Sequence, residues 1–288
     1  MKKIIILLFL VICAQQIYAK DYTQYCSPNS VNKNFSGNLA SISGFNAISR
    51  NIIESQIQKA VKKETNSKFN IKINNFFGSN VLKGEFKSLK AVSKKYTHNN
   101  LYLSDVNVET VCPYNHISYE DEKLLFDENM VLKYSAKITQ EDLNEMINSS
   151  EYKNILDKIN NDKIVSSLVK VQNYNVEIKE DKLLFKYDIL PLPKYDIIGL
   201  SKGIIKPISF TFGANLKVVD GKIEVCDFAL NSKNTNYGAF LPIINKLNPT
   251  SWKMNIDNDN EGKLEVESVK IANSQIEVVG YIIVEKNK

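Results

Sequence analysis

The chain has 288 residues, of which 43% are hydrophobic and 24% are charged, and its formal net charge at pH 7 is +5. This length and apolar content are enough for a real core, in one large domain or two small ones. The 37 basic and 32 acidic residues are scattered along the chain, which argues against a nucleic-acid-binding patch and leaves only a modest attraction to anionic membrane surfaces.

The N-terminus has the pattern of a secretory signal peptide. Two lysines precede a short apolar run, and a cleavage site follows at Ala19. The run is shorter than the about 20 apolar residues that a transmembrane helix needs. Cys13 ends the run, but Ile12 stands before it where a lipoprotein signal has a small residue, which argues against lipidation. We therefore expect residues 1–19 to be removed and the mature protein to be exported, to the periplasm or the extracellular face of a cell envelope.

A polar lead-in and an amphipathic helix are expected next. Residues 20–46 are polar and rich in turn-forming residues, which predicts a loose segment. The apolar residues that follow recur at helical spacing, and they are Ile48, Ile52, Ile53, Ile57, Ala60 and Val61. The isoleucines need a cover, and the sequence leaves open whether this cover is the protein's own sheet or a lipid.

Alternation of apolar and polar residues then predicts a series of strands that each have one dry face. These runs begin at Phe69, Val81, Leu101, Leu124 and Met130, and Gly78 and Gly84 mark turns or bulges between them. The period changes at Thr139, a helix-capping residue with Asp142 three positions on, which is close to a capping box. A short amphipathic helix is therefore expected here, followed by another that starts near Ser149.

The second half is again rich in strand patterns. Asp220-Gly221 is a strong hairpin signal and Asn273-Ser274 a weaker one, and 239–249 is typical of a short helix that ends at a proline. Many strands joined by hairpins, with few helices, predict an α+β fold: an elongated antiparallel sheet, curled into a tubular or barrel-like form around one or two amphipathic helices. Residues 47–285 would form one domain, in which a loose two-fold repeat of about 47–160 and 164–285 is left open.

The cysteines permit at most one intramolecular disulfide, because three of them follow the expected cleavage site and an exported protein can form such bonds. Cys26 lies in the lead-in and Cys112 lies beside a proline in a turn, and this is the favoured pair. Cys226 lies in an apolar strand pattern that predicts a buried free thiol.

The sequence displays no catalytic constellation. His98 and His116 lie in polar surroundings without a partner at metal-ligand spacing, so we expect no metal and no cofactor. A nucleophile elbow, a phosphate-binding loop and a dinucleotide fingerprint are all absent from the sequence. An acidic turn, formed by Asp121, Glu122, Asp127 and Glu128, is interpreted as a solvated hairpin rather than as an acid–base pair or a calcium site. We expect a protein that is not an enzyme.

Large apolar side chains are instead abundant on the predicted strands. A curled sheet and an isoleucine-faced helix can enclose an elongated groove for an acyl chain, although the same residues could simply fill the core. From the apolar pattern alone, the residues expected to line the groove are Ile52, Ile53, Ile57, Phe77, Phe86, Leu143 and Met146. We expect contacts with a headgroup phosphate from Lys83, Lys87, Lys94 and Lys95.

The order of these pieces resembles the LmeA-like phospholipid-binding family of bacterial cell-envelope proteins. The resemblance covers about residues 48–283, and its most specific parts are the leucine–glycine step at 82–84, the Thr-Gln-Glu-Asp-Leu-Asn phrase at 139–144 and the closing hairpin at 266–280. It implies an exported protein that binds phospholipid and contacts the membrane peripherally, in lipid handling or transfer without chemical turnover. Because these motifs are structural, no ligand contact is carried over from the family.

Two rival functions remain from the sequence. A structural or adhesive envelope protein would use the same strands with a dry core and without any lipid ligand. A hydrolase of envelope lipid or glycan would need a serine or carboxylate site that the sequence does not display.

Overall fold

A computed structural model provides the structure of the chain. It describes residues 21–27, 43–65, 67–75, 83–98, 100–120, 123–149, 153, 157, 160–163, 166, 169–179, 181–191, 207–230 and 262–286. Several sequence predictions lie outside these residues: the signal peptide, Phe77, Gly78, Asp121, Glu122 and the helix at 239–249.

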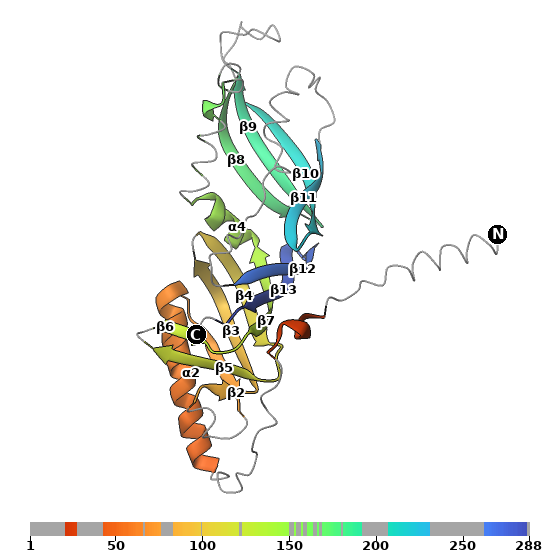
Figure 1. The fold of residues 1–288 in the computed structure, drawn as a ribbon. Helices are drawn as coiled ribbons and strands as arrows, with labels where there is room; N and C mark the ends of the chain where they lie inside the picture. Colours follow the sequence, from red (N-terminus) through yellow and green to blue (C-terminus); the bar gives the residue numbers. More distant parts are fainter. Residues whose placement is uncertain are drawn as a thin grey trace, which may run out of the picture.

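The protein is elongated, with a four-stranded sheet at one end and a long helix beside a larger sheet at the other (Figure 1). The helix α2 spans Ser43–Thr65 and begins before the apolar stripe that predicted it. Its contacts with strands are mainly with β1, and those with β3 and β6 are fewer. The sheet therefore covers the C-terminal part of the stripe, where Ile57 and Ala60 are buried, while Ile52 is exposed.

The larger sheet has six antiparallel strands in the order β1-β3-β4-β7-β13-β12. Their bounds are Asn70–Asn74 for β1, Ser88–His98 for β3, Leu101–Thr110 for β4, Met130–Thr139 for β7, Gln275–Val284 for β13 and Lys263–Ala272 for β12. The C-terminal hairpin thus completes a sheet that the first half of the chain begins. The two halves suggested by the sequence do not form separate sheets.

The smaller sheets are both antiparallel. The four-stranded sheet has the order β11-β10-β9-β8, with β8 at Val169–Lys179, β9 at Lys182–Pro191, β10 at Ile208–Val219 and β11 at Lys222–Leu230. The three-stranded sheet has the order β2-β5-β6, with β2 at Glu85–Phe86, β5 at Asn115–Glu120 and β6 at Lys123–Phe126.

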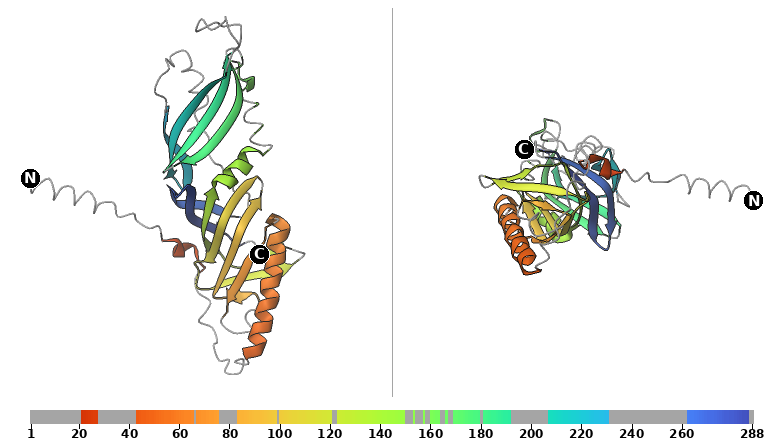
Figure 2. Two further views of the ribbon diagram at one scale, coloured as in Figure 1. Left: turned by 180° about the vertical axis from the view of Figure 1, so that it is seen from behind. Right: turned by 60° about the horizontal axis from the view of Figure 1, so that its bottom comes forward.

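The expectation of one curled, tubular sheet around the helices is wrong in its details. The strands within the described residues form three open sheets, and α2 packs beside the six-stranded one rather than inside it (Figure 2). The two larger sheets remain separate because of the way they meet. At their junction the hairpin turn of β10–β11 meets the edge of β12, and Val266 N–H donates to the Gly221 carbonyl at 2.8 Å. A turn that meets an edge cannot extend the hydrogen-bonded ladder, so the sheets stay separate.

The local signals for helix capping and hairpins are confirmed. The helix α4 spans Gln140–Ile147, and Thr139 and Asp142 form a reciprocal capping box at its start. Both predicted hairpins have positive φ at their two central residues, 51° and 72° at Asp220 and Gly221, and 52° and 57° at Asn273 and Ser274. This is the backbone of a type I′ turn, whose twist matches that of paired antiparallel strands.

The prediction of a loose lead-in is wrong for its first part. Residues 21–27 include the short 3₁₀ helix η1 at Tyr22–Tyr25, and Cys26 forms a disulfide with Cys112. This is the pair favoured from the sequence. Cys226 differs from expectation, because its side chain is only partly buried in β11. The strand bulges next to it, at Asp227, whose φ is 52°.

Candidate functional site

The inner faces of the sheets form one continuous apolar face, which is buried and consists of two clusters. We call the first the α2 cluster, which contains Ile57, Phe69, Ile71, Ile73, Phe86, Ala91, Val106, Ile117, Met130, Ala136 and Val284. We call the second the distal cluster, which joins Ile138, Leu143, Ile271, Ile276, Val278 and Val266 to the inward residues of β8–β11. Leu103 packs against both clusters. On β7, Ala136 belongs to the first cluster and Ile138 to the second, and residues two apart share one face of a strand.

A β-bulge keeps this face apolar where it crosses β4. The register with β7 shifts between Ser104 and Asn107, and Asp105 has a φ of 47°. The extra residue allows Leu103 and Val106 to lie on the same face although they are three positions apart. Asp105 faces outward, where Lys137 Nζ donates to its carboxylate at 3.2 Å and lowers the pKa of the carboxyl group.

The inner face of the four-stranded sheet is lined with aromatic rings. Tyr174 pairs with Tyr187 across β8 and β9, Tyr187 pairs with Phe210 on β10, and Phe185 pairs with Phe212. The ring centroids of Tyr174 and Tyr187 lie 4.7 Å apart, and those of Tyr187 and Phe212 lie 5.8 Å apart with edge-to-face geometry. Burial raises the pKa of Tyr187, whose side chain has no exposed surface. The sequence pattern showed these aromatic residues but not their alignment.

The groove residues expected from the sequence are divided between the two clusters. Ile57 and Phe86 are buried in the α2 cluster and Ile53 packs against it, while Leu143 and Met146 belong to the distal cluster. Ile52 does not lie on this face, because its side chain is 49% exposed. Periodicity could not exclude Ile52, since a helical stripe wide enough to cover a sheet includes residues at its margin.

The four lysines expected at a headgroup do not converge. Lys94 Nζ lies 3.7 Å from Asp105 Oδ1, and Lys95 Nζ lies 3.6 Å from Glu141 Oε1. Both lysines lie in the second half of β3. Lys83 and Lys87 are exposed before the start of that strand. At about 3.3 Å per residue, Lys87 and Lys94 are on the order of 20 Å apart. The structure thus divides the lysines into two groups too distant to hold one phosphate.

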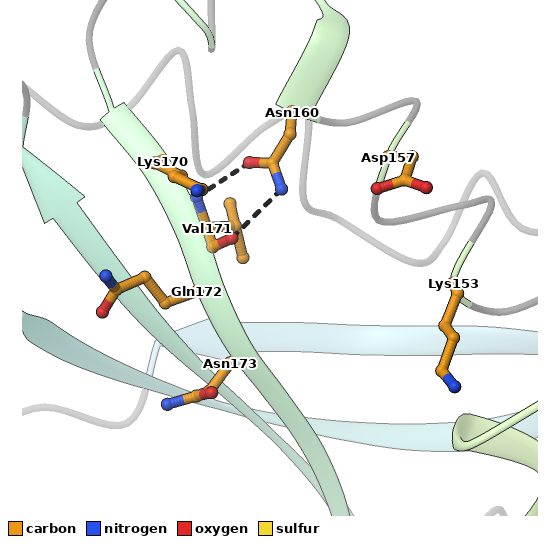
Figure 3. A pocket seen from close by; sticks show the side chains of 7 residues that line it. All are labelled: Lys153, Asp157, Asn160, Lys170, Val171, Gln172 and Asn173. Carbon is orange, nitrogen blue, oxygen red and sulfur yellow. Dashed lines mark hydrogen bonds between the residues drawn. The ribbon is translucent and has the colours of Figure 1, made fainter.

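A polar pocket of about 480 Å³ lies beside the outer edge of β8 (Figure 3). It is lined by Lys153, Asp157, Asn160, Lys170, Val171, Gln172 and Asn173. The first three are helical residues of the segment that precedes β8. The other four are consecutive on β8. Sequence reasoning missed this pocket, because its two walls become neighbours only in the fold.

Side-chain amides occupy the outer edge of β8 in two places. Val171 N–H donates to Asn160 Oδ1 at 2.9 Å, and Asn160 Nδ2 donates to the Val171 carbonyl at 3.1 Å (Figure 3). Further along, Ile178 N–H donates to Gln140 Oε1 at 2.7 Å, and Gln140 Nε2 donates to the Val176 carbonyl at 2.8 Å. Each amide thus makes two hydrogen bonds that a neighbouring strand would otherwise make.

The segment 21–27 covers the opposite face of the six-stranded sheet, near β13. The ring of Tyr22 stacks on that of Tyr281 with centroids 3.7 Å apart, and the Tyr22 hydroxyl donates to Glu265 Oε2 at 3.0 Å. Val131 and Ile283 complete this small cluster together with Cys112. The disulfide therefore fastens an N-terminal strap onto the sheet.

The histidines have structural contacts. His116 Nε2 lies 2.9 Å from the Lys83 carbonyl oxygen and 3.8 Å from Asp127 Oδ2, which ties β5 to the turn before β2. His98 is exposed at the end of β3. Within the described ranges, His, Cys, Asp and Glu side chains form no group of three that could hold a metal ion. The same part of the chain contains no helix with the length and apolar character needed to cross a bilayer.

No known family model, curated protein or solved structure matches this chain. Its candidate sites are therefore interpreted from their own chemistry: a long apolar face, a strap on the opposite face and a polar pocket at the edge of the four-stranded sheet.

Proposed function

We propose that the protein is an exported, non-catalytic binder of phospholipid or a similar amphiphile, and that the acyl chain lies along the continuous apolar face. The observation that carries this proposal is the continuity of that face. The α2 cluster and the distal cluster meet at Leu103, and together they extend from α2 to the aromatic rows of β8–β10. A long apolar interior in an elongated molecule matches the elongated shape of an acyl chain.

Three further features support the proposal. The resemblance to the LmeA-like family, which rests on the sequence alone, implies a phospholipid ligand. The signal-peptide pattern implies export, and the disulfide between Cys26 and Cys112 agrees with an oxidising compartment.

The first experiment is native mass spectrometry of the mature protein purified without detergent, with organic extraction of any bound molecule. A reproducible adduct of phospholipid mass is the expected result. A protein that carries no adduct and also fails to bind phospholipid vesicles would contradict the proposal.

A pair of tryptophan variants locates the ligand. Leu103→Trp places an indole on the apolar face, and Val92→Trp places one on the opposite face of the same sheet, where Val92 is 38% exposed. Brominated phospholipid quenches nearby tryptophan fluorescence, so we expect strong quenching of the first variant and little of the second. The wild-type chain, with its single Trp252, supplies the baseline. Equal quenching of both variants would place the lipid elsewhere.

A second function, a structural or interaction protein of the envelope with a dry core, is favoured by one specific observation. Phe86, Phe210 and Phe212 are each only 1% exposed, so these rings already pack against other protein atoms. A lipid would then have to displace existing contacts. The two functions differ in the mass experiment, because the dry protein carries no adduct.

A further inference from the structure

We propose that the pocket beside β8 binds an extended peptide segment of another protein, which adds to the edge of the four-stranded sheet as a further strand. The partner is a polypeptide in β conformation, held mainly by its backbone. This site differs in chemistry from the amphiphile-binding face, because its lining is polar except for Val171, which belongs to the distal cluster.

The shape of the pocket supports a strand as its occupant. One wall is a run of four consecutive residues on an edge strand, from Lys170 to Asn173, and the other is formed by the helical residues Lys153, Asp157 and Asn160 (Figure 3). A groove between an edge strand and a helix is a common place for β-strand addition, in which main-chain hydrogen bonds provide affinity.

The hydrogen bonds at Val171 supply the second argument. Both the N–H and the carbonyl of this residue point away from β9 and are satisfied by the single carboxamide of Asn160. A residue of an antiparallel neighbouring strand would make the same two bonds. Asn160 therefore occupies the position of a peptide group and protects the edge while no partner is bound.

The charges of the lining indicate which peptides fit. Lys153 and Lys170 provide two cations, and Asp157 is the single carboxylate among the lining residues. All three side chains are exposed. An extended peptide with an acidic side chain at its centre can therefore pair with a lysine at the rim, and this pairing adds selectivity more than affinity.

The test is a selection from a displayed library of random peptides against the purified mature protein. We expect a pool enriched in β-forming, acidic peptides. Lys170→Glu should weaken its binding at least several-fold. The matched control Lys179→Glu, which changes an exposed lysine on the same strand but outside the pocket, should leave binding unchanged. The proposal would be refuted if the selection enriched no peptides, or if the two variants bound the enriched peptides equally well.

A second substitution distinguishes a peptide from a small polar ligand, according to whether it strengthens or weakens binding. Asn160→Ala removes the group that a peptide must displace, so peptide binding should become about fivefold tighter, which corresponds to about 1 kcal/mol for a net hydrogen bond. Asn175→Ala, on β8 but outside the pocket lining, serves as the control. Weaker binding by the Asn160 variant would overturn strand addition and make Asn160 a ligand contact. Binding of phosphatidylglycerol vesicles through Lys170, without any peptide pool, would instead assign the pocket to a lipid headgroup.

Discussion

The phenol ring of Tyr134 lies over Gly280, its directly paired residue across β7 and β13. A methyl group built on Gly280 would lie 2.6 Å from the Tyr134 hydroxyl oxygen and would also meet the Glu265 carbonyl. Tyr134 packs against the distal cluster, near the point where the apolar face passes from one sheet to the other. The glycine thus leaves space for an aromatic ring at this junction.

Gly280→Ala should destabilise the protein by about 1–3 kcal/mol, the usual cost of overpacking, because neither the ring nor the strand beside it can move freely. Gly213→Ala is the matched control, since a methyl group there would meet its nearest neighbour, Leu184 Cδ2, at an ordinary 3.9 Å. Urea unfolding measures both variants. Equal stabilities would show that the close approach of Tyr134 carries no energy.

Because Tyr134 is largely buried, we also expect the stability of the protein to depend on pH in the alkaline range. Burial raises the pKa of Tyr134 to about 12, so the folded protein holds the phenolic proton more tightly than the unfolded chain, whose tyrosines titrate near about 10. This contribution is complete below about pH 10 and is lost as the pH rises towards 12. Tyr134→Phe should therefore flatten the decline in the free energy of unfolding over that range, as followed by urea melts. An unchanged slope would contradict the assignment.

The buried carboxylate of Asp142 should be essential to α4. It accepts hydrogen bonds of 2.8 Å from Thr139 N, Thr139 Oγ1 and Ser104 Oγ, and it is 1% exposed. Asp142→Ala should cost about 2–3 kcal/mol, because it removes a helix cap and leaves the Ser104 hydroxyl without this acceptor. Exposed Glu141, changed to alanine, should cost less than about 0.5 kcal/mol. Denaturant melts that show equal losses would refute the role of the cap.

The disulfide should dominate the stability of the strap. Cys26 and Cys112 are 86 residues apart in the sequence, and closure of so long a loop in the unfolded chain is worth about 2–5 kcal/mol. Cys26→Ser should lower the unfolding midpoint by a corresponding amount and make it insensitive to reductant. Cys226→Ser, which changes the free thiol, should retain the wild-type response to reductant. A Cys26 variant as stable as wild type would show that the Tyr22–Tyr281 stack alone holds the strap.

Local signals in the sequence determined the elements of this protein. The two I′ hairpins, the capping box at Thr139 and the strands β4 and β7 follow from side-chain period and turn chemistry, which act over a few neighbouring residues. The preference for pairing Cys26 with Cys112 also came from local context, because both cysteines lie beside the regular elements. These features need no knowledge of what packs against them.

Only the tertiary structure decided how these elements combine. Periodicity gives each strand an apolar face but does not say which strands share a sheet, so three open sheets replaced the expected curled one. It made Ile52 equivalent to Ile57, although the sheet covers only Ile57. Similarly, the meeting of Asn160 with Val171 depends on which segments the fold brings side by side. Contacts between residues distant in the chain are set by the packing of whole surfaces, and a local pattern does not contain that information.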